Sequence, residues 1–65
     1  MSIRVVLADD HRMIIAALRS MLEKETDIAV VGEAGDGAAL LETVARTTPD
    51  VAVVDIAMPG MNGIE

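Results

Sequence analysis

The feature that most constrains the fold is a short apolar run that is interrupted by an acid. Residues 51–56 read Val-Ala-Val-Val-Asp-Ile, and proline and glycine follow at Pro59 and Gly60. Such valine-rich runs are typical of strands buried on both faces of a parallel sheet. Asp55 lies where the strand should finish, and open α/β sheets bind ligands outside the carboxyl ends of their strands. A buried charge is costly unless it is paired or bound to metal, so we expect Asp55 to have a partner or a chemical role.

The expected partners of Asp55 are near the start of the chain. Residues 3–8 form a second apolar run, Ile-Arg-Val-Val-Leu-Ala, which ends in Asp9 and Asp10. If the two runs are neighbouring parallel strands, the three acids converge at one edge of the sheet. Close carboxylates repel one another without a cation, and their oxygen atoms suit Mg²⁺. One of them could then attack a phosphoryl group, as the nucleophile of either a phosphate-accepting switch or a phosphatase.

The rest of the chain alternates helical and extended patterns. We predict helices over residues 12–24 and 38–46, a strand over 28–33, and the start of another helix at residues 63–65. Strands that alternate with helices indicate an α/β fold with a parallel sheet and right-handed crossovers. The first helix should face the sheet through Met13, Ile14, Ala17, Leu18, Met21 and Leu22, leaving Ile15 and Ala16 outside this stripe. The second should bury Leu40, Leu41, Val44 and Ala45.

Two further features have a functional and a structural interpretation. The glycine-rich run 32–37 suggests a dinucleotide loop, but its spacing is GxxGxG and it follows the second strand. A tight loop with Asp36 capping the next helix is the better interpretation. His11 could be a metal ligand or a proton relay, but Mg²⁺ prefers oxygen, which favours an exposed residue at the helix start. Met58 and Met61 could line a recognition surface or pack beneath the loop.

Composition limits the function of the chain. Sixty-five residues make at most one small domain, and the chain has no cysteine for disulfides. Hydrophobic residues make up 52% of it, which fits a fragment of a larger domain or an obligate oligomer. The net charge of −6 argues against nucleic-acid contact by this segment. No apolar run is long enough to span a membrane and the first residues lack the plan of a signal peptide, so we predict a cytoplasmic location.

Three blocks of the sequence together resemble a known family. They are residues 7–11 (Leu-Ala-Asp-Asp-His), 31–37 (Val-Gly-Glu-Ala-Gly-Asp-Gly), and 49–63, which holds Asp55 and the Met-Pro-Gly-Met-Asn-Gly segment. In order and spacing they are similar to the receiver domain of bacterial two-component response regulators of the LuxR/NarL type. The resemblance implies a flavodoxin-like sheet with strand order two-one-three.

The resemblance also implies roles for individual residues. Asp55 matches the phosphate-accepting aspartate of the family. Asp10 matches the direct Mg²⁺ ligand, and Asp9 matches the acid that reaches the metal through water. Ala57 matches the position whose backbone carbonyl completes the metal site. A sensor histidine kinase would supply the phosphoryl group, and a DNA-binding output domain beyond this segment would respond.

The chain also departs from the family. A receiver of this type has five strand–helix units, so residues 1–65 correspond to a partial receiver domain that stops inside the third. The family's hydroxyl residue and lysine on the last two strands have no counterpart here. This favours, as an alternative, a non-switching fragment that binds metal and forms a homodimer through strand 51–56. A phosphatase is disfavoured because Ala57 occupies the position where such enzymes want a second acid.

Overall fold

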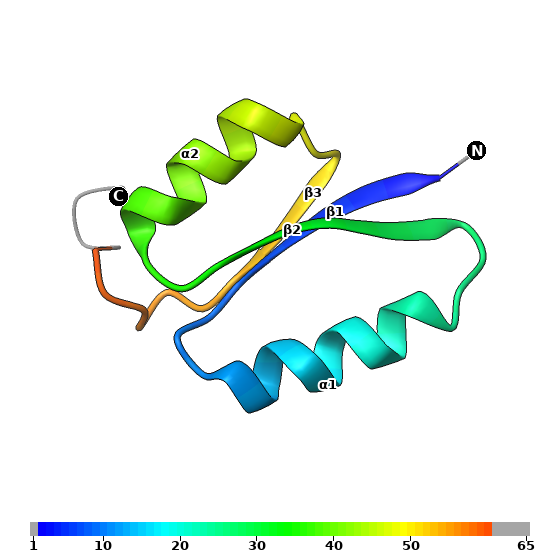
Figure 1. The fold of residues 1–65 in the computed structure, drawn as a ribbon, viewed down its shortest axis with the longest axis horizontal. Helices are drawn as coiled ribbons and strands as arrows, with labels where there is room; N and C mark the ends of the chain where they lie inside the picture. The colour runs from blue at the N-terminus through cyan, green and yellow to red at the C-terminus, as the bar shows by residue number, and fades with distance from the viewer. Residues whose placement is uncertain (1, 61–65) are drawn as a thin grey trace.

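The structure, a computed structural model that describes residues 2–60, alternates strands and helices along the chain (Figure 1). The elements are β1 (Ile3–Ala8), α1 (Arg12–Glu23), β2 (Ile28–Ala34), α2 (Gly37–Thr47) and β3 (Val51–Val54). This order confirms the predicted α/β class. The helix predicted to begin at residue 63 lies outside the described residues. Neither described helix is long and apolar enough to cross a membrane.

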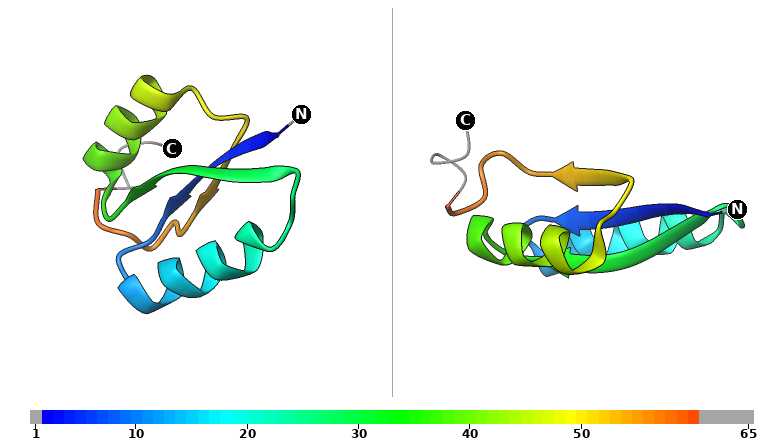
Figure 2. Two further views of the ribbon diagram at one scale, coloured as in Figure 1. Left: turned by 45° about the vertical axis from the view of Figure 1, so that its right-hand side comes forward. Right: turned by 90° about the horizontal axis from the view of Figure 1, so that it is seen from above.

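The three strands form one parallel sheet with β1 in the middle, in the order β2-β1-β3. This confirms the order expected from the family resemblance. Helices α1 and α2 lie on opposite faces of the sheet, and both begin near the carboxyl ends of the strands (Figure 1). Seen from above, β3 is the strand farthest from both helices (Figure 2). The parallel arrangement therefore brings the ends of β1 and β3 to the same edge.

Helix α1 buries a different face from the one that we predicted. Ile15 is 8% exposed and packs on Val5 and Leu7 of β1, with Leu18 and Leu22 partly buried beside it. The prediction was wrong for the other four residues of the expected stripe, because they are exposed: Met13, Ile14, Ala17 and Met21. Both faces of α1 are apolar, and a helix can present only one of them to a single sheet.

The buried face of helix α2 also differs from the predicted one. Leu40 is buried as predicted, but Leu41, Val44 and Ala45 are exposed. Thr43 is buried in their place, and a Cβ atom at Gly32 would lie 2.6 Å from its methyl carbon. Apolar side chains alone are therefore a poor guide to the buried face here. A glycine on β2 leaves the room that a threonine methyl group fills.

Strand β3 is shorter and more exposed than its sequence suggests. It ends at Val54, and Ile56 is 85% exposed in the following loop, so the prediction of a strand to residue 56 was wrong. Val51, Ala52 and Val53 are exposed as well. The prediction that β3 is buried on both faces was therefore also wrong. Within the described residues β3 pairs only with β1. In this part of the chain β3 is therefore an edge strand.

Candidate functional site

The acidic residues lie where β1 and β3 end. The backbone N–H of Asp9 donates to the carbonyl oxygen of Ala34 at 3.0 Å, and that of Asp55 donates to Ala8 at 2.9 Å. The ladder hydrogen bonds thus continue to the first acid after each strand. Both side chains are then held at the carboxyl edge of the sheet, which is where α/β sheets place their ligands.

Four potential ligand atoms gather at this edge. One atom each from Asp9, Asp10, His11 and Asp55 lies within 4.8 Å of the others. The sequence predicted that the three aspartates would converge, and the geometry agrees. Three carboxylates offer hard oxygen ligands and leave room for water, so their donor chemistry fits Mg²⁺. A divalent cation would also offset their mutual repulsion.

His11 faces two of these acids. Its Nδ1 lies 2.8 Å from Oδ1 of Asp9 and 3.0 Å from Oδ1 of Asp10. The hydrogen bond with Asp9, followed by the charge of Asp10, raises the pKa of His11 above its usual 6.5. The pKa of Asp9 is lowered from 3.8, chiefly because its carboxylate accepts the backbone N–H of His11 and then by the imidazole. His11 is exposed at the start of α1, as predicted, but its ring belongs to the cluster.

The loop after β3 holds the Asp55 carboxylate in place. The N–H of Ala57 donates to Oδ1 of Asp55 at 2.9 Å, and the N–H of Met58 donates to the Asp55 carbonyl at 3.1 Å. The described residues contain no cis peptide bond, so Met58–Pro59 is trans. A role of the Ala57 carbonyl in metal binding remains a prediction. Met61, the other methionine proposed for a recognition surface, lies outside the described residues.

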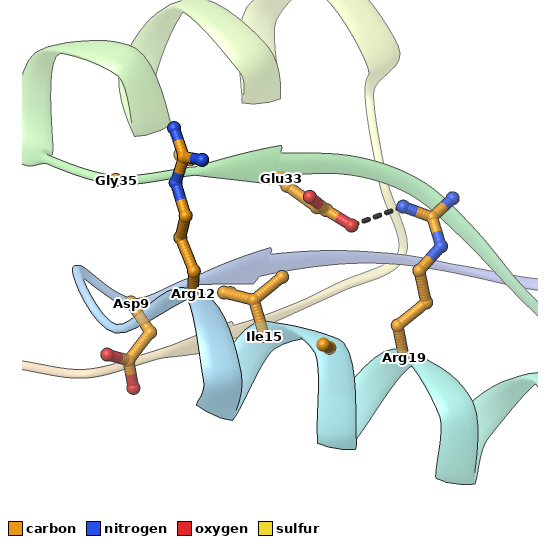
Figure 3. A pocket seen from close by; sticks show the side chains of 8 residues that line it. Asp9, Arg12, Ile15, Arg19, Glu33 and Gly35 are labelled. Atoms are coloured by element: carbon orange, nitrogen blue, oxygen red, sulfur yellow. Dashed lines mark hydrogen bonds and ion pairs between the residues drawn. The ribbon is translucent and has the colours of Figure 1, made fainter.

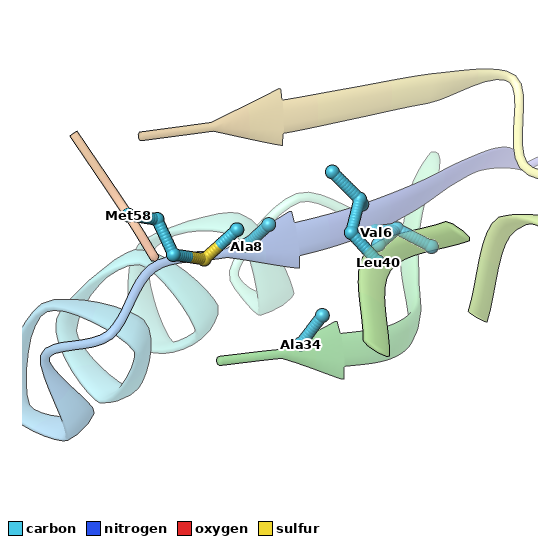
Figure 4. Close-up of a cluster of buried hydrophobic side chains, with 5 residues drawn as sticks. All are labelled: Val6, Ala8, Ala34, Leu40 and Met58. Carbon is cyan, nitrogen blue, oxygen red and sulfur yellow. The ribbon is translucent and has the colours of Figure 1, made fainter. Parts of the chain in front are cut away.

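Met58 anchors this loop to the core. Its side chain is 1% exposed and packs in a cluster with Ala8, Ala34 and Leu40 (Figure 4). Of the two roles considered for Met58, packing beneath the loop is the one observed. Because Ala8 and Ala34 are also the last residues of β1 and β2, the same contacts support the strand ends that position the acids.

The glycine-rich segment supports the loop from the other side. Asp36 caps α2, because its Oδ1 accepts the N–H of Ala39 at 2.7 Å. The N–H of Gly37 donates to the carbonyl of Pro59 at 2.8 Å. The predicted capping role of Asp36 is confirmed. The glycines allow a turn and a close backbone approach, which agrees with the interpretation of residues 32–37 as a tight loop.

A groove beside the acids was not foreseen from the sequence. It runs between α1 and the end of β2, and Arg12 and Arg19 extend across it (Figure 3). Arg19 forms ion pairs with Glu33 and Glu23, whereas Arg12 forms none within residues 2–60. The seven-residue spacing of the arginines, which puts them on one helical face, was the available signal. The groove is lined by Asp9, Arg12, Ile15, Ala16, Arg19, Glu33, Ala34 and Gly35.

Comparison with known proteins identifies the family. Residues 5–65 match the response regulator receiver domain. The chain belongs to this family. A curated relative, the transcriptional regulatory protein LiaR of Bacillus subtilis, is 46% identical over 63 residues, which are 97% of this chain and 30% of LiaR. The match confirms the resemblance that the three sequence blocks suggested.

Solved structures agree with this assignment. The signal receiver domain of the putative response regulator NarL from Mycobacterium tuberculosis is 44% identical, with a TM-score of 0.87 over 91% of this chain and 48% of that one. RcsB from Salmonella enterica serovar Typhimurium, bound to promoter rprA with the phosphomimetic BeF₃⁻, is 33% identical with a TM-score of 0.87. That match covers 92% of this chain and 30% of RcsB. The chain therefore spans about a third of these regulators and about half of the NarL receiver domain.

Proposed function

We propose that this chain is the phosphoacceptor part of a two-component response regulator and that Asp55 receives the phosphoryl group. The observation that carries the proposal is the convergence of Asp9, Asp10 and Asp55, whose ligand atoms lie within 4.8 Å of one another at the sheet edge. A carboxylate beside two further acids suits attack on phosphorus with a divalent cation present. RcsB, a relative solved with the phosphomimetic BeF₃⁻, supports the same chemistry by relationship.

The proposed step transfers a phosphoryl group from a phosphohistidine of a sensor histidine kinase. An oxygen of Asp55 forms a bond to phosphorus, and the bond between phosphorus and the donor nitrogen breaks. The imidazole that leaves takes a proton from solvent. Asp10 would bind Mg²⁺ directly, Asp9 through water, and Ala57 through its carbonyl. When bound, Mg²⁺ would neutralise charge on the transferred group.

The output of this switch is proposed from the relatives. LiaR is a transcriptional regulatory protein, and RcsB was solved on promoter DNA. We expect phosphorylation here to control a DNA-binding domain outside residues 1–65, because the segment itself carries a net charge of −6. Residues 1–65 would then form a partial receiver domain in the cytoplasm, with no enzymatic turnover of its own. Ala57 supports the last point, since a phosphatase would want an acid there.

Intact mass spectrometry tests the proposal directly. The purified protein, at the length at which it occurs, is incubated with acetyl phosphate and Mg²⁺. One added phosphoryl group is expected, and it should be absent from Asp55→Asn and reduced when EDTA removes the metal. Asp27→Asn, which changes an exposed acid outside the cluster, is the matched control and should be phosphorylated normally. Phosphorylation that persists in Asp55→Asn would contradict the assignment.

The exposed edge of β3 favours a second candidate, a self-associating module. Val51, Ala52 and Val53 are exposed on an edge strand, and such edges recruit other strands. We propose a homodimer in which β3 pairs with its copy about a two-fold axis. Pairing centred between Ala52 and Val53 would set Asp50 opposite Asp55 of the second copy, and like charges opposed in this way are destabilising. Association should therefore strengthen with salt, and a monomer in sedimentation at micromolar concentration would contradict it.

A further inference from the structure

We infer that His11 is an additional metal ligand, which lets the acid cluster bind transition-metal ions such as Co²⁺ and Zn²⁺ as well as Mg²⁺. This inference rests on the metal site of the proposed function and adds one residue to it. It concerns which cations the site selects, not the identity of the phosphoacceptor. Imidazole nitrogen suits zinc, copper, iron and nickel, whereas carboxylate and water oxygen suit magnesium, calcium and manganese.

The position of the imidazole supports this role. Its Nδ1 lies 2.8 Å from Oδ1 of Asp9 and 3.0 Å from Oδ1 of Asp10. Zinc ligands lie about 2.0–2.2 Å from the metal, so the ligand atoms of a tetrahedral site are roughly 3.3–3.6 Å apart. The four potential ligand atoms already lie within 4.8 Å of one another. Small side-chain movements would bring them around one cation, which replaces the proton shared between His11 and Asp9.

Apart from its contacts with Asp9 and Asp10, the His11 ring has no structural task within the described residues. His11 is the N-cap residue of α1, but its side chain makes no capping hydrogen bond. The side chain is 66% exposed, whereas that of Asp9 is 13% exposed. The imidazole can therefore turn toward a bound ion without disturbing packing. Mg²⁺ keeps oxygen ligands and several waters, so it should have little use for this nitrogen.

The two classes of metal consequently respond differently to loss of His11. In His11→Ala, we expect the affinity for Co²⁺ and Zn²⁺ to fall at least tenfold. The affinity for Mg²⁺ should stay within about twofold, because all its expected ligands remain. This difference between the metals separates a ligand from a residue that only supports the fold. Damage to the fold would weaken the binding of all three ions together.

The experiment titrates the purified protein with Co²⁺ and follows its visible absorption, which reports on the ligands of the ion. Zn²⁺ and Mg²⁺ affinities then come from calorimetry without any phosphoryl donor. Met13→Ala changes an exposed neighbour on α1 and should leave all affinities unchanged. His11→Gln tests whether an uncharged side chain of similar length restores binding, and Co²⁺ affinity should stay low.

The inference is overturned if His11→Ala leaves Co²⁺ and Zn²⁺ affinity unchanged, or if Mg²⁺ affinity falls equally. It is also overturned if the Co²⁺ spectrum is the same with and without His11. Failure of the proposed function is distinguishable, because it appears as an unmodified Asp55 after acetyl phosphate treatment. Metal selectivity set by His11 does not depend on that result.

Discussion

Gly37 donates its backbone N–H to the carbonyl oxygen of Pro59 at 2.8 Å, which joins the start of α2 to the loop that follows Asp55. The approach is close enough to exclude a side chain. A Cβ atom at Gly37 would lie 2.5 Å from the carbonyl oxygen of Gly60. Gly60 itself has a φ of 84°, a conformation that glycine adopts readily. The acid-bearing loop and the start of α2 are therefore in direct backbone contact.

Gly37→Ala should displace this loop. We expect a loss of about 1–3 kcal/mol in the free energy of unfolding, the usual effect of overpacking, measured by urea denaturation. Metal affinity should fall as well, because Asp55 begins the displaced segment. Gly35→Ala is the matched control, since a Cβ atom at Gly35 meets nothing within 4 Å. Equal stability of the two variants would refute the close contact.

Met58→Ala should destabilise the same loop from below. Met58 is 1% exposed in the cluster with Ala8 and Leu40, so truncation leaves a cavity and should cost about 2–5 kcal/mol. Met13→Ala, at an 85% exposed position, should change the free energy of unfolding by less than about 0.5 kcal/mol. Met58→Leu should recover most of the loss. A small effect in Met58→Ala would mean that the loop is not anchored by this side chain.

Most of the fold and the acid site could be predicted because local patterns specify them. The valine-rich runs predicted the strands. Because an acid directly follows each of two runs, the sequence also predicted that Asp9 and Asp55 lie at the sheet edge. The buried helix faces could not be predicted in the same way. Met13 and Ile15 are both apolar and lie on different faces of α1, and only the packing on β1 selects Ile15.

The remaining errors depend on contacts between distant residues. Thr43 is buried because Gly32, on another element, leaves room for its methyl group, which composition cannot show. The inclusion of His11 in the site depends on a side-chain orientation that aims Nδ1 at Asp9. The burial expected of β3 presumed covering elements on both faces, which the described residues do not supply.

The pKa of His11 should depend on Asp9. The hydrogen bond to Asp9 and the charge of Asp10 raise the pKa of His11 above 6.5. Asp9→Asn should therefore lower the His11 pKa toward that value, as seen by NMR titration of its ring protons without metal. Asp27→Asn, whose carboxylate is not among those that shift His11, should leave it unchanged. An unaltered pKa in Asp9→Asn would show that the pair does not persist in solution.

The same pair predicts how pH affects stability. A raised His11 pKa stabilises the folded state fully below about 6.5, and this contribution is lost as pH rises through the folded value. The lowered pKa of Asp9 contributes stability above 3.8, and this contribution is lost as pH falls through the folded value. Both contributions are present between these limits, so urea midpoints should be highest there. Asp9→Asn should flatten the profile, and a profile that keeps its shape would exclude this origin.

Val53→Lys tests the proposed pairing of β3. Val53 is 42% exposed on the edge strand, and lysine on an edge blocks pairing with another chain. We expect the variant to be monomeric in sedimentation at concentrations where the unmodified chain associates. Met13→Lys adds the same charge at an exposed position on α1 and should still associate. If Met13→Lys abolishes association and Val53→Lys does not, the exposed apolar stripe of α1 is the interface and the β3 edge is not.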